Sequence, residues 1–207
     1  MISARLTSSP THSHTYSLCC LHPSIHPFTC VSVLAEHDGA LSVYVTPKMV
    51  PLDHALAGCK TNGNGVVLRS ANLGTTSYMG PGAGRYETAN SVVADVLRIA
   101  HGTASHKAFP NTDESLELDS NYESPFYVRI PYSDTLGVVR QIGESAEACG
   151  ISIHSMLQNP IQDRMQADVC VLTETCGMKQ MEGFIDKLEG HDFCRVRPVY
   201  MPLLKEL

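Results

Sequence analysis

The C-terminal part of the chain carries six periodic segments whose order restricts the fold. Two of them repeat apolar residues at three- and four-residue steps, which predicts helices at 138–149 and 178–188. The other four are short and alternating or apolar, which predicts strands at 126–131, 151–153, 168–173 and 194–201. Strand, helix, strand, strand, helix, strand is the order of a ferredoxin-like sandwich, with two helices on one face of an antiparallel sheet. We therefore expect an α+β domain over residues 125–207.

Residues 31–101 predict a second, smaller sheet with a helix over it. Alternating segments at 31–35 and 41–45 flank the turn signal Asp38-Gly39 and predict a hairpin. Shorter strands are expected at 66–68 and 77–79. A helix is expected over 89–100, and its wide apolar stripe predicts that it is largely buried.

Two segments carry no periodic pattern. Residues 1–30 are rich in Ser, Thr, His, Pro and Cys, and Arg5 is their only formal charge. We expect a disordered leader, or residues absent from the mature protein; an organelle transit peptide stays open. Residues 102–124 carry several acids and few large apolar side chains, which predicts an acidic linker.

Composition excludes several classes of protein. The net charge of -6 provides no basic surface for nucleic acid, and no apolar run approaches the roughly 20 residues of a membrane helix. The eight cysteines include no Cys-x-x-Cys pair, so we expect free thiols and no disulfide framework. The spacing of Cys19, Cys20, His22, His26 and Cys30 fits no standard zinc site, and we expect no metal.

The run Gly80-Pro81-Gly82-Ala83-Gly84 directly precedes the helix expected over 89–100. Main-chain N–H groups in such a loop can hold an anion or let a cofactor approach closely, and a simple tight turn is an equal alternative. The run is not the dinucleotide fingerprint, because Arg85 stands where the third glycine would be.

Three segments resemble homoserine dehydrogenases. Residues 45–54 are similar to the family's Val-x-Pro…Val-Pro…Asp-His-Pro-Leu-Ala segment, and residues 64–66 to its Asn-Ala-Val. Residues 80–95 resemble its signature Gly-Pro-Gly-Ala-Gly-Arg-x-x-Thr-Ala-x-x-Val-Val-x-Asp. The resemblance covers 31–101 as the C-terminal part of the catalytic domain, with its remaining sheet and a covering helix. Residues 125–207 match the ACT regulatory domain that usually follows it.

The resemblance implies reduction of aspartate 4-semialdehyde to homoserine with NADP or NAD as cofactor, in threonine, methionine and isoleucine biosynthesis. It places Gly82 and Gly84 at the cofactor and His54 near the active site and the subunit interface. The family's cofactor-binding domain and catalytic lysines lie upstream of the matched segments, so we expect no catalytic residue here and no activity of this chain alone. Lys48 and Lys60 lie outside the lysine motifs and are interpreted as solvated.

Two departures from the family pattern affect local structure. Ala55 stands where the family usually has proline and Gly65 where it usually has alanine, which we expect to loosen a loop and a strand start.

The segment Ser133-Asp134-Thr135-Leu136-Gly137 precedes the helix expected over 138–149. Ser or Asp in this position is typical of a helix cap. The resemblance implies more: in ACT domains this loop lines a small-molecule pocket where two domains pair edge to edge. Asp134 and Gly137 are therefore candidate effector-binding residues, and threonine is the usual effector of this pathway.

Two functions remain open from the sequence. The chain is either an N-terminally incomplete homoserine dehydrogenase or a catalytically dead amino-acid-binding module that acts through its ACT domain; a non-functional fragment is a weaker third alternative. We expect a homo-oligomer with small-molecule ligands. The expected location is the cytoplasm, or the plastid if residues 1–30 are a transit peptide.

Overall fold

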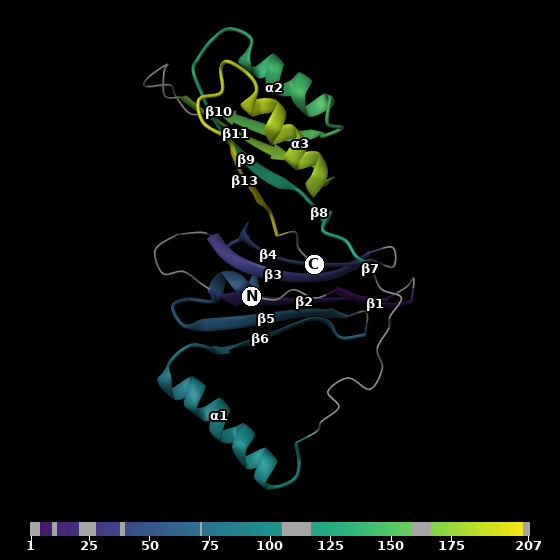
Figure 1. The fold of residues 1–207 in the computed structure, drawn as a ribbon, viewed down its shortest axis with the longest axis vertical. Helices are drawn as coiled ribbons and strands as arrows, with labels where there is room; N and C mark the ends of the chain where they lie inside the picture. The colour runs from purple at the N-terminus through teal and green to yellow at the C-terminus, as the bar shows by residue number, and fades with distance from the viewer. Residues whose placement is uncertain are drawn as a thin grey trace. The chain divides into compact units, whose positions relative to one another are not determined.

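The computed structural model is a mixed α/β fold in two compact units (Figure 1). Unit 1 takes residues 1–45 and 52–119, and unit 2 takes residues 46–51 and 120–206. The structure describes a set of ranges separated by gaps: residues 5–9, 12–20, 28–37, 40–70, 72–104, 117–158 and 167–204. No helix among these residues is long and apolar enough to cross a membrane.

Unit 1 is built on one sheet with the strand order β6-β5-β2-β3-β4-β7, to which β1 adds by pairing with β2. Its strands are β1 (Arg5–Ser9), β2 (His12–Cys20), β3 (Phe28–His37), β4 (Ala40–Met49), β5 (Gly63–Ser70), β6 (Gly74–Pro81) and β7 (Glu117–Leu118). The predicted hairpin is confirmed as the neighbours β3 and β4, and the two shorter predicted strands are β5 and β6.

Among the described residues of the expected leader, 12–20 form a strand of the sheet. Strand β2 lies between β3 and β5 in the sheet and pairs antiparallel with both, for example Leu18 with Ser32 and with Val66. A strand with a neighbour on each side is stabilised by two ladders of backbone hydrogen bonds. Such pairing cannot be predicted from the period of apolar residues in the sequence. The cysteines and histidines weighed for zinc lie outside the residues whose side chains are described.

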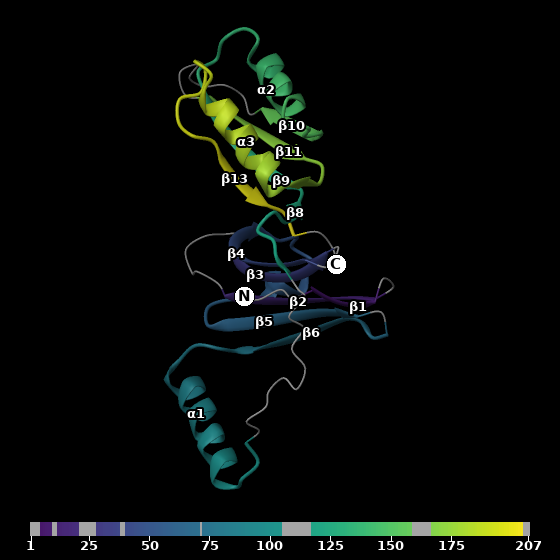
Figure 2. The same ribbon diagram turned by 45° about the vertical axis from the view of Figure 1, so that its right-hand side comes forward.

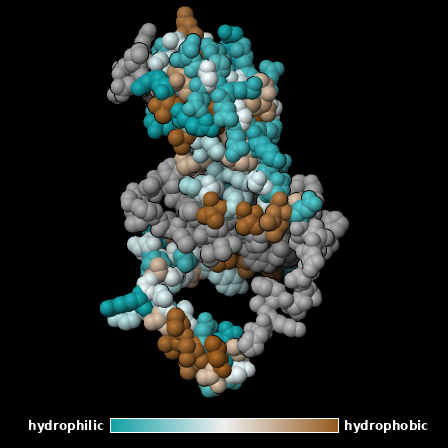
Figure 3. All heavy atoms as spheres, in the orientation of Figure 1, coloured by the Kyte–Doolittle hydropathy of each residue, from teal (hydrophilic) through white to brown (hydrophobic). Residues whose placement is uncertain are grey.

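Helix α1 (Arg85–Ala100) confirms the predicted helix, but its predicted burial is wrong. None of its residues is buried, and its apolar side chains are each more than half exposed, among them Val92, Val93, Val96, Leu97 and Ile99. Figure 3 shows a brown, hydrophobic patch over this helix. The stripe is present, but none of the described residues of unit 1 buries it.

Unit 2 is an antiparallel four-stranded sheet with the order β10-β11-β9-β13. All six predicted segments are present, and the last strand starts later than predicted because Cys194 makes only an isolated bridge to Tyr132. The elements are β9 (Phe126–Tyr132), α2 (Val138–Glu147), β10 (Ile153–Gln158), β11 (Ala167–Thr173), α3 (Met178–Glu189) and β13 (Val199–Pro202). A small ribbon joins β8 (Glu123–Ser124) to β12 (Cys176–Gly177).

Both helices of unit 2 pack on the same face of its sheet (Figure 2). Alternate residues of β9 and β11 point into one core, where Phe126, Val128 and Val171 are fully buried. Ile142 of α2 and Phe184 of α3 are fully buried in that same core. The apolar residues that alternate along the strands and those that recur every 3.6 residues along the helices therefore pack in one core.

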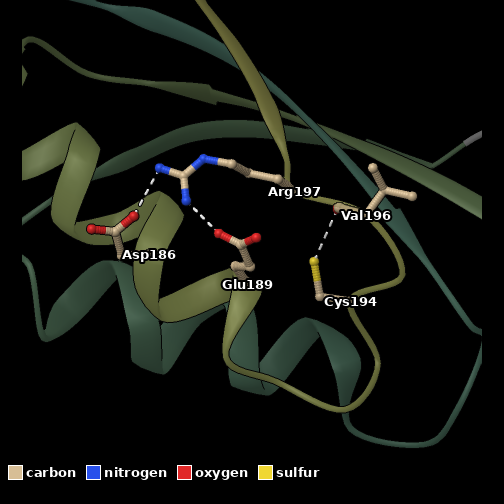
Figure 4. A network of polar contacts seen from close by, with 5 residues as sticks. All are labelled: Asp186, Glu189, Cys194, Val196 and Arg197. Atoms are coloured by element: carbon tan, nitrogen blue, oxygen red, sulfur yellow. Dashed lines mark hydrogen bonds and ion pairs between the residues drawn. The ribbon is translucent and has the colours of Figure 1, made fainter.

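The segment between α3 and β13 is tied to α3 by Arg197 (Figure 4). Its guanidinium donates to Asp186 Oδ1 at 2.8 Å and to a carboxylate oxygen of Glu189. These hydrogen bonds raise the pKa of Arg197. The Cys194 thiol donates to the Val196 carbonyl oxygen at 3.3 Å. All these groups lie at the surface, so the network sets the path of the chain more than its stability.

Candidate functional site

The glycine loop, residues 80–84, leads from β6 into α1 and is held by Asn62. The main-chain oxygen of Asn62 accepts the N–H of Gly82 at 2.8 Å and that of Ala83 at 3.4 Å. The side-chain Nδ2 of Asn62 donates to the Ala83 carbonyl oxygen at 2.9 Å. The register of the β5–β6 hairpin, with Gly63 opposite Pro81, brings Asn62 beside the loop.

Gly84 is favoured by its backbone, and Gly82 by a close neighbour. Gly84 has φ 139°, a conformation that side chains rarely allow, and a Cβ there would lie 2.2 Å from Glu87 Oε2. A Cβ on Gly82 would lie 1.7 Å from Asn64 Nδ2, the end of a side chain that would have to move. The loop is exposed along its length, with Asn64 and Glu87 beside these two glycines.

The anion-binding interpretation of this loop loses part of its support. The N–H groups of Gly82 and Ala83 already donate to Asn62. The Glu87 carboxylate lies beside Gly84 in the first turn of α1, where a bound anion would be repelled. The hydrogen bonds to Asn62 fit the alternative of a tight turn, and the approach of a cofactor to Gly82 and Gly84 stays a prediction.

His54 caps the short helix η1 (Ala55–Gly58), which packs against β5. Its Nδ1 accepts the N–H of Leu56 at 3.2 Å, so in this position the ring proton lies on Nε2. The structure thus places His54 at η1, whereas Gly82 and Gly84 lie between β6 and α1.

Gly65 is tightly packed, which corrects the expectation that it loosens the strand start. A Cβ on Gly65 would lie 2.6 Å from Cys59 Sγ and 3.0 Å from Leu56 Cδ2. Leu56 is fully buried and Cys59 nearly so. The space that an alanine would need is therefore taken by side chains of η1 and its C-terminal flank.

Lys60 is exposed as predicted, but the interpretation of Lys48 as solvated is wrong. Lys48 is only 4% exposed, and burial lowers its pKa to about 8. In β4 the less exposed positions are Ser42, Tyr44, Thr46 and Lys48, whereas Val43 and Val45 between them are exposed. A strand that turns its apolar residues inward would instead bury Val43 and Val45 and expose Lys48.

A pocket of about 160 Å³ lies at the start of α2 in unit 2. Asp134 and Gly137, the two candidate effector residues, both line it. The full lining is Tyr132, Asp134, Thr135, Leu136, Gly137, Val138, Val139, Gln158 and Val169. The structure therefore brings the predicted pair together at one cavity.

The helix-cap interpretation of this segment is wrong. Gly137 itself is the N-cap of α2, with φ 88°, and no side chain caps the helix there. Across the pocket, Gln158 Nε2 donates to the Tyr132 hydroxyl at 2.5 Å. The pKa of Tyr132 is raised, first by burial and then by the charges of Asp134 and Asp168.

The sequence has relatives among homoserine dehydrogenases. The model of the homoserine dehydrogenase family matches residues 26–97. The homoserine dehydrogenase of Neisseria gonorrhoeae is 29% identical over 86% of this chain and 43% of that protein. The NAD(+)-dependent homoserine dehydrogenase of Pseudomonas canavaninivorans is 40% identical over 34% of this chain and 20% of that protein.

Solved structures of the same family share the fold. A homoserine dehydrogenase from Thiobacillus denitrificans superposes with a TM-score of 0.71 at 23% identity, over 86% of this chain and 42% of that one. That of S. aureus gives a TM-score of 0.53 at 17% identity, over 87% and 42%. The chain spans about two fifths of the length of these relatives. Residues 26–97 thus match the homoserine dehydrogenase family, and the chain is similar in sequence to a part of its members and shares their fold.

Proposed function

We propose that the chain is part of an NAD(P)H-dependent homoserine dehydrogenase that reduces aspartate 4-semialdehyde to homoserine. The observation that carries this proposal is the glycine loop: it lies inside the matched residues 26–97, and Gly84 has a φ of 139° that favours glycine. A relative that is NAD(+)-dependent by name supports a nicotinamide cofactor.

The residues of the loop fit a cofactor in one specific respect. The loop is exposed, and at Gly80 an added Cβ would meet no atom within 4 Å, so a flat ring can approach the main chain there. At Gly82 and Gly84 the side chains of Asn64 and Glu87 would have to move to admit it. Gly82 and Gly84 would lie against the cofactor, which supplies the hydride when bound. The residues of this chain contribute approach and orientation, and His54 holds the neighbouring segment through its cap on η1.

An activity assay tests the proposal. Because the chain spans about two fifths of its relatives, we expect the 207 residues alone to show no homoserine oxidation above background. Proton transfer contributes about 10²–10⁴-fold and orientation of reactants more, so their loss removes turnover. A chimera that adds the rest of the Neisseria gonorrhoeae relative should turn over.

In that chimera, Gly84→Val should raise the KM for the cofactor. Gly143→Val is the matched control, because Gly143 lies in α2 outside the loop and an added Cβ there meets no atom within 4 Å. Turnover by the short chain would refute our account of where the catalytic groups lie. An unchanged cofactor KM in Gly84→Val would refute the assignment of the loop.

We also propose that unit 2 is an ACT domain that binds a small amino acid such as threonine. The strand order β10-β11-β9-β13 with both helices on one face supports a ferredoxin-like arrangement. The pocket supports the ligand class, because a carboxylate at Asp134 suits an ammonium group and the start of α2 suits a carboxylate.

Calorimetric titration of the chain with threonine tests this second proposal. Asp134→Asn should weaken binding at least tenfold, as expected for loss of a charged hydrogen bond. Asp192→Asn, an exposed aspartate outside the pocket, should not. Threonine binding together with an inactive chimera would favour the regulatory module over the enzyme. Equal affinity in both variants would exclude Asp134 from the site.

We propose that the chain forms a homo-oligomer with small-molecule ligands. The exposed apolar side chains of α1 support burial against another surface. Light scattering at micromolar concentration checks this, and a clean monomer would contradict it. The proposed location is the cytoplasm, or the plastid if residues 1–30 are a transit peptide.

A further inference from the structure

One asparagine joins three parts of unit 1: the turn before β5, the glycine loop and the first turn of α1. Asn62 binds Gly82 and Ala83 through its main-chain oxygen, and Nδ2 binds the Ala83 carbonyl oxygen. The same Nδ2 donates to Glu87 Oε1 at 3.2 Å. Residue 83 is thus held on both its N–H and its carbonyl side by one residue.

Glu87 completes the connection from Asn62 to Gly84. Its Oε1 accepts from Asn62, and its Oε2 occupies the place where a side chain on Gly84 would be. The carbonyl oxygen of Gly84 then accepts the N–H of Thr88 at 3.0 Å, which starts the hydrogen bonding of α1. Gly84, whose φ is positive, therefore lies between the Glu87 side chain, which Asn62 binds, and the first hydrogen bond of α1.

We propose that Asn62 is the positioning residue of the glycine loop and that it acts through Glu87 to hold Gly84 in its open conformation. The role of the loop as cofactor surface rests on the proposed function; the holding of the loop rests on the contacts alone. A loop that is already ordered loses less entropy when a ligand binds. Because the whole loop is exposed, its order contributes little to global stability.

The test uses charge substitution at the 62–87 contact in the full 207-residue chain. Asn62→Asp removes the donor and sets a second carboxylate beside Glu87. Glu87→Gln in that background returns a donor and removes the repulsion. The matched control is Asn72→Asp, at the opposite end of the β5–β6 hairpin.

Hydrogen exchange of the segment 82–88 is the first measurement. We expect exchange about tenfold faster in Asn62→Asp, a partial return in Asn62→Asp/Glu87→Gln, and no change in the control. The thermal midpoint should stay the same in all variants. Unchanged exchange in Asn62→Asp, or no return toward the parent in Asn62→Asp/Glu87→Gln, would overturn the proposal.

NADH affinity of the chimera described under the proposed function, followed by fluorescence titration, separates this proposal from the function. We expect about tenfold weaker binding when the chimera carries Asn62→Asp, and recovery in the double variant. If the parent chimera binds NADH and the substitutions at Asn62 leave the affinity unchanged, the positioning role is refuted. If hydrogen exchange responds as expected but the parent chimera does not bind NADH, the positioning role stands and the cofactor assignment fails.

Discussion

Gly65 lies in β5 beneath η1, where Cys59 and Leu56 occupy the space that an alanine methyl group would need. We predict that Gly65→Ala lowers the free energy of unfolding by about 1–3 kcal/mol, the usual cost of overpacking a filled site. Urea unfolding followed by circular dichroism measures the change. The alanine usual in the family is therefore incompatible with the side chains around it in this chain.

A double-mutant cycle tests the cause of that cost. Cys59→Ala removes the sulfur that lies 2.6 Å from the added carbon. Gly65→Ala should then cost less in the Cys59→Ala background than in the parent. An equal cost in both backgrounds would mean that Cys59 is not the obstacle.

Lys48 predicts a specific dependence of stability on pH. Burial lowers its pKa from 10.5 to about 8, so between these values the unfolded chain binds more protons than the folded one. The contribution of Lys48 to the free energy of unfolding therefore rises with pH from about 8 to 10.5, by about 3 kcal/mol at most. Below pH 8 Lys48 is protonated in both the folded and the unfolded chain, so this gain in stability is absent.

The variant Lys48→Met isolates this effect from other groups. Because the parent gains stability as Lys48 loses its proton, we expect the stability of Lys48→Met relative to the parent to fall between pH 7 and pH 10. Tyr122 and Tyr127, whose pKa values burial raises to about 12, titrate in both proteins and cancel in the comparison. A stability difference that is the same at pH 7 and pH 10 would contradict the buried, titrating amine.

The sequence identified the candidate residues that carry a local pattern and missed those that act at a distance. The glycine loop stands out as a glycine run before a helix, whereas the cofactor role of Gly82 and Gly84 and the effector role of Asp134 come from the family resemblance. Asn62 was not identified because its contacts to Ala83 and Glu87 are 21 and 25 residues away. Such a role depends on the hairpin register, which the sequence of the loop does not contain.

At the scale of elements, α1 and α2 show what an apolar stripe predicts. Both stripes correctly predicted helices. In α2 the stripe is covered by the sheet and α3, and Ile142 is fully buried, whereas Val96 of α1 is 57% exposed. An apolar stripe with a 3.6-residue period predicts a helix with a face that can pack. It does not predict which other element covers that face.

Helix α3 receives its N-terminal cap from a distant segment. Asn121 Oδ1 accepts the N–H of Lys179 at 2.9 Å, and Gln180 Oε1 accepts that of Gly177 at 2.9 Å. Gly177 has no side chain with which to cap the helix. We predict that Asn121→Ala lowers the free energy of unfolding of the chain by about 1 kcal/mol, measured by urea unfolding.

The conservative variant Asn121→Asp distinguishes capping from other effects of the substitution. An aspartate keeps the acceptor and places a negative charge at the helix N-terminus, so no loss of stability is expected. A loss as large as that of Asn121→Ala would show that the amide of Asn121 acts through some other contact.

At the scale of the whole molecule, segment order proved more informative than composition. The order of six periodic segments predicted the elements of unit 2, because each pattern there is strong and its partner lies within the same unit. Composition alone led to a disordered leader over residues 1–30, where β2 instead pairs on both sides. Its histidines and serines lack the apolar character by which strands are usually found, although polar strands pair equally well.

The boundary between the two units lies at the end of the predicted linker 102–124. On one side, β7 pairs with β4, and the N–H of Asp119 donates to the Leu41 carbonyl oxygen at 3.1 Å. On the other side, Asn121 caps α3, and the Ser124 hydroxyl donates to the Leu203 carbonyl oxygen at 3.0 Å. Both ends of the short segment 117–124 are thus anchored by hydrogen bonds.

We predict that limited proteolysis first cuts within residues 102–116, where the sequence is polar and acidic. Lys107 and Glu114 offer sites for trypsin and for a glutamate-specific protease. The C-terminal product should keep residues 120–204 and resist further digestion, because its core and the α3 cap are complete without the preceding residues. Mass spectrometry of the products measures the cut. A first cut inside 126–200, or a product that starts at Pro125 and stays resistant, would contradict a boundary at Ser120.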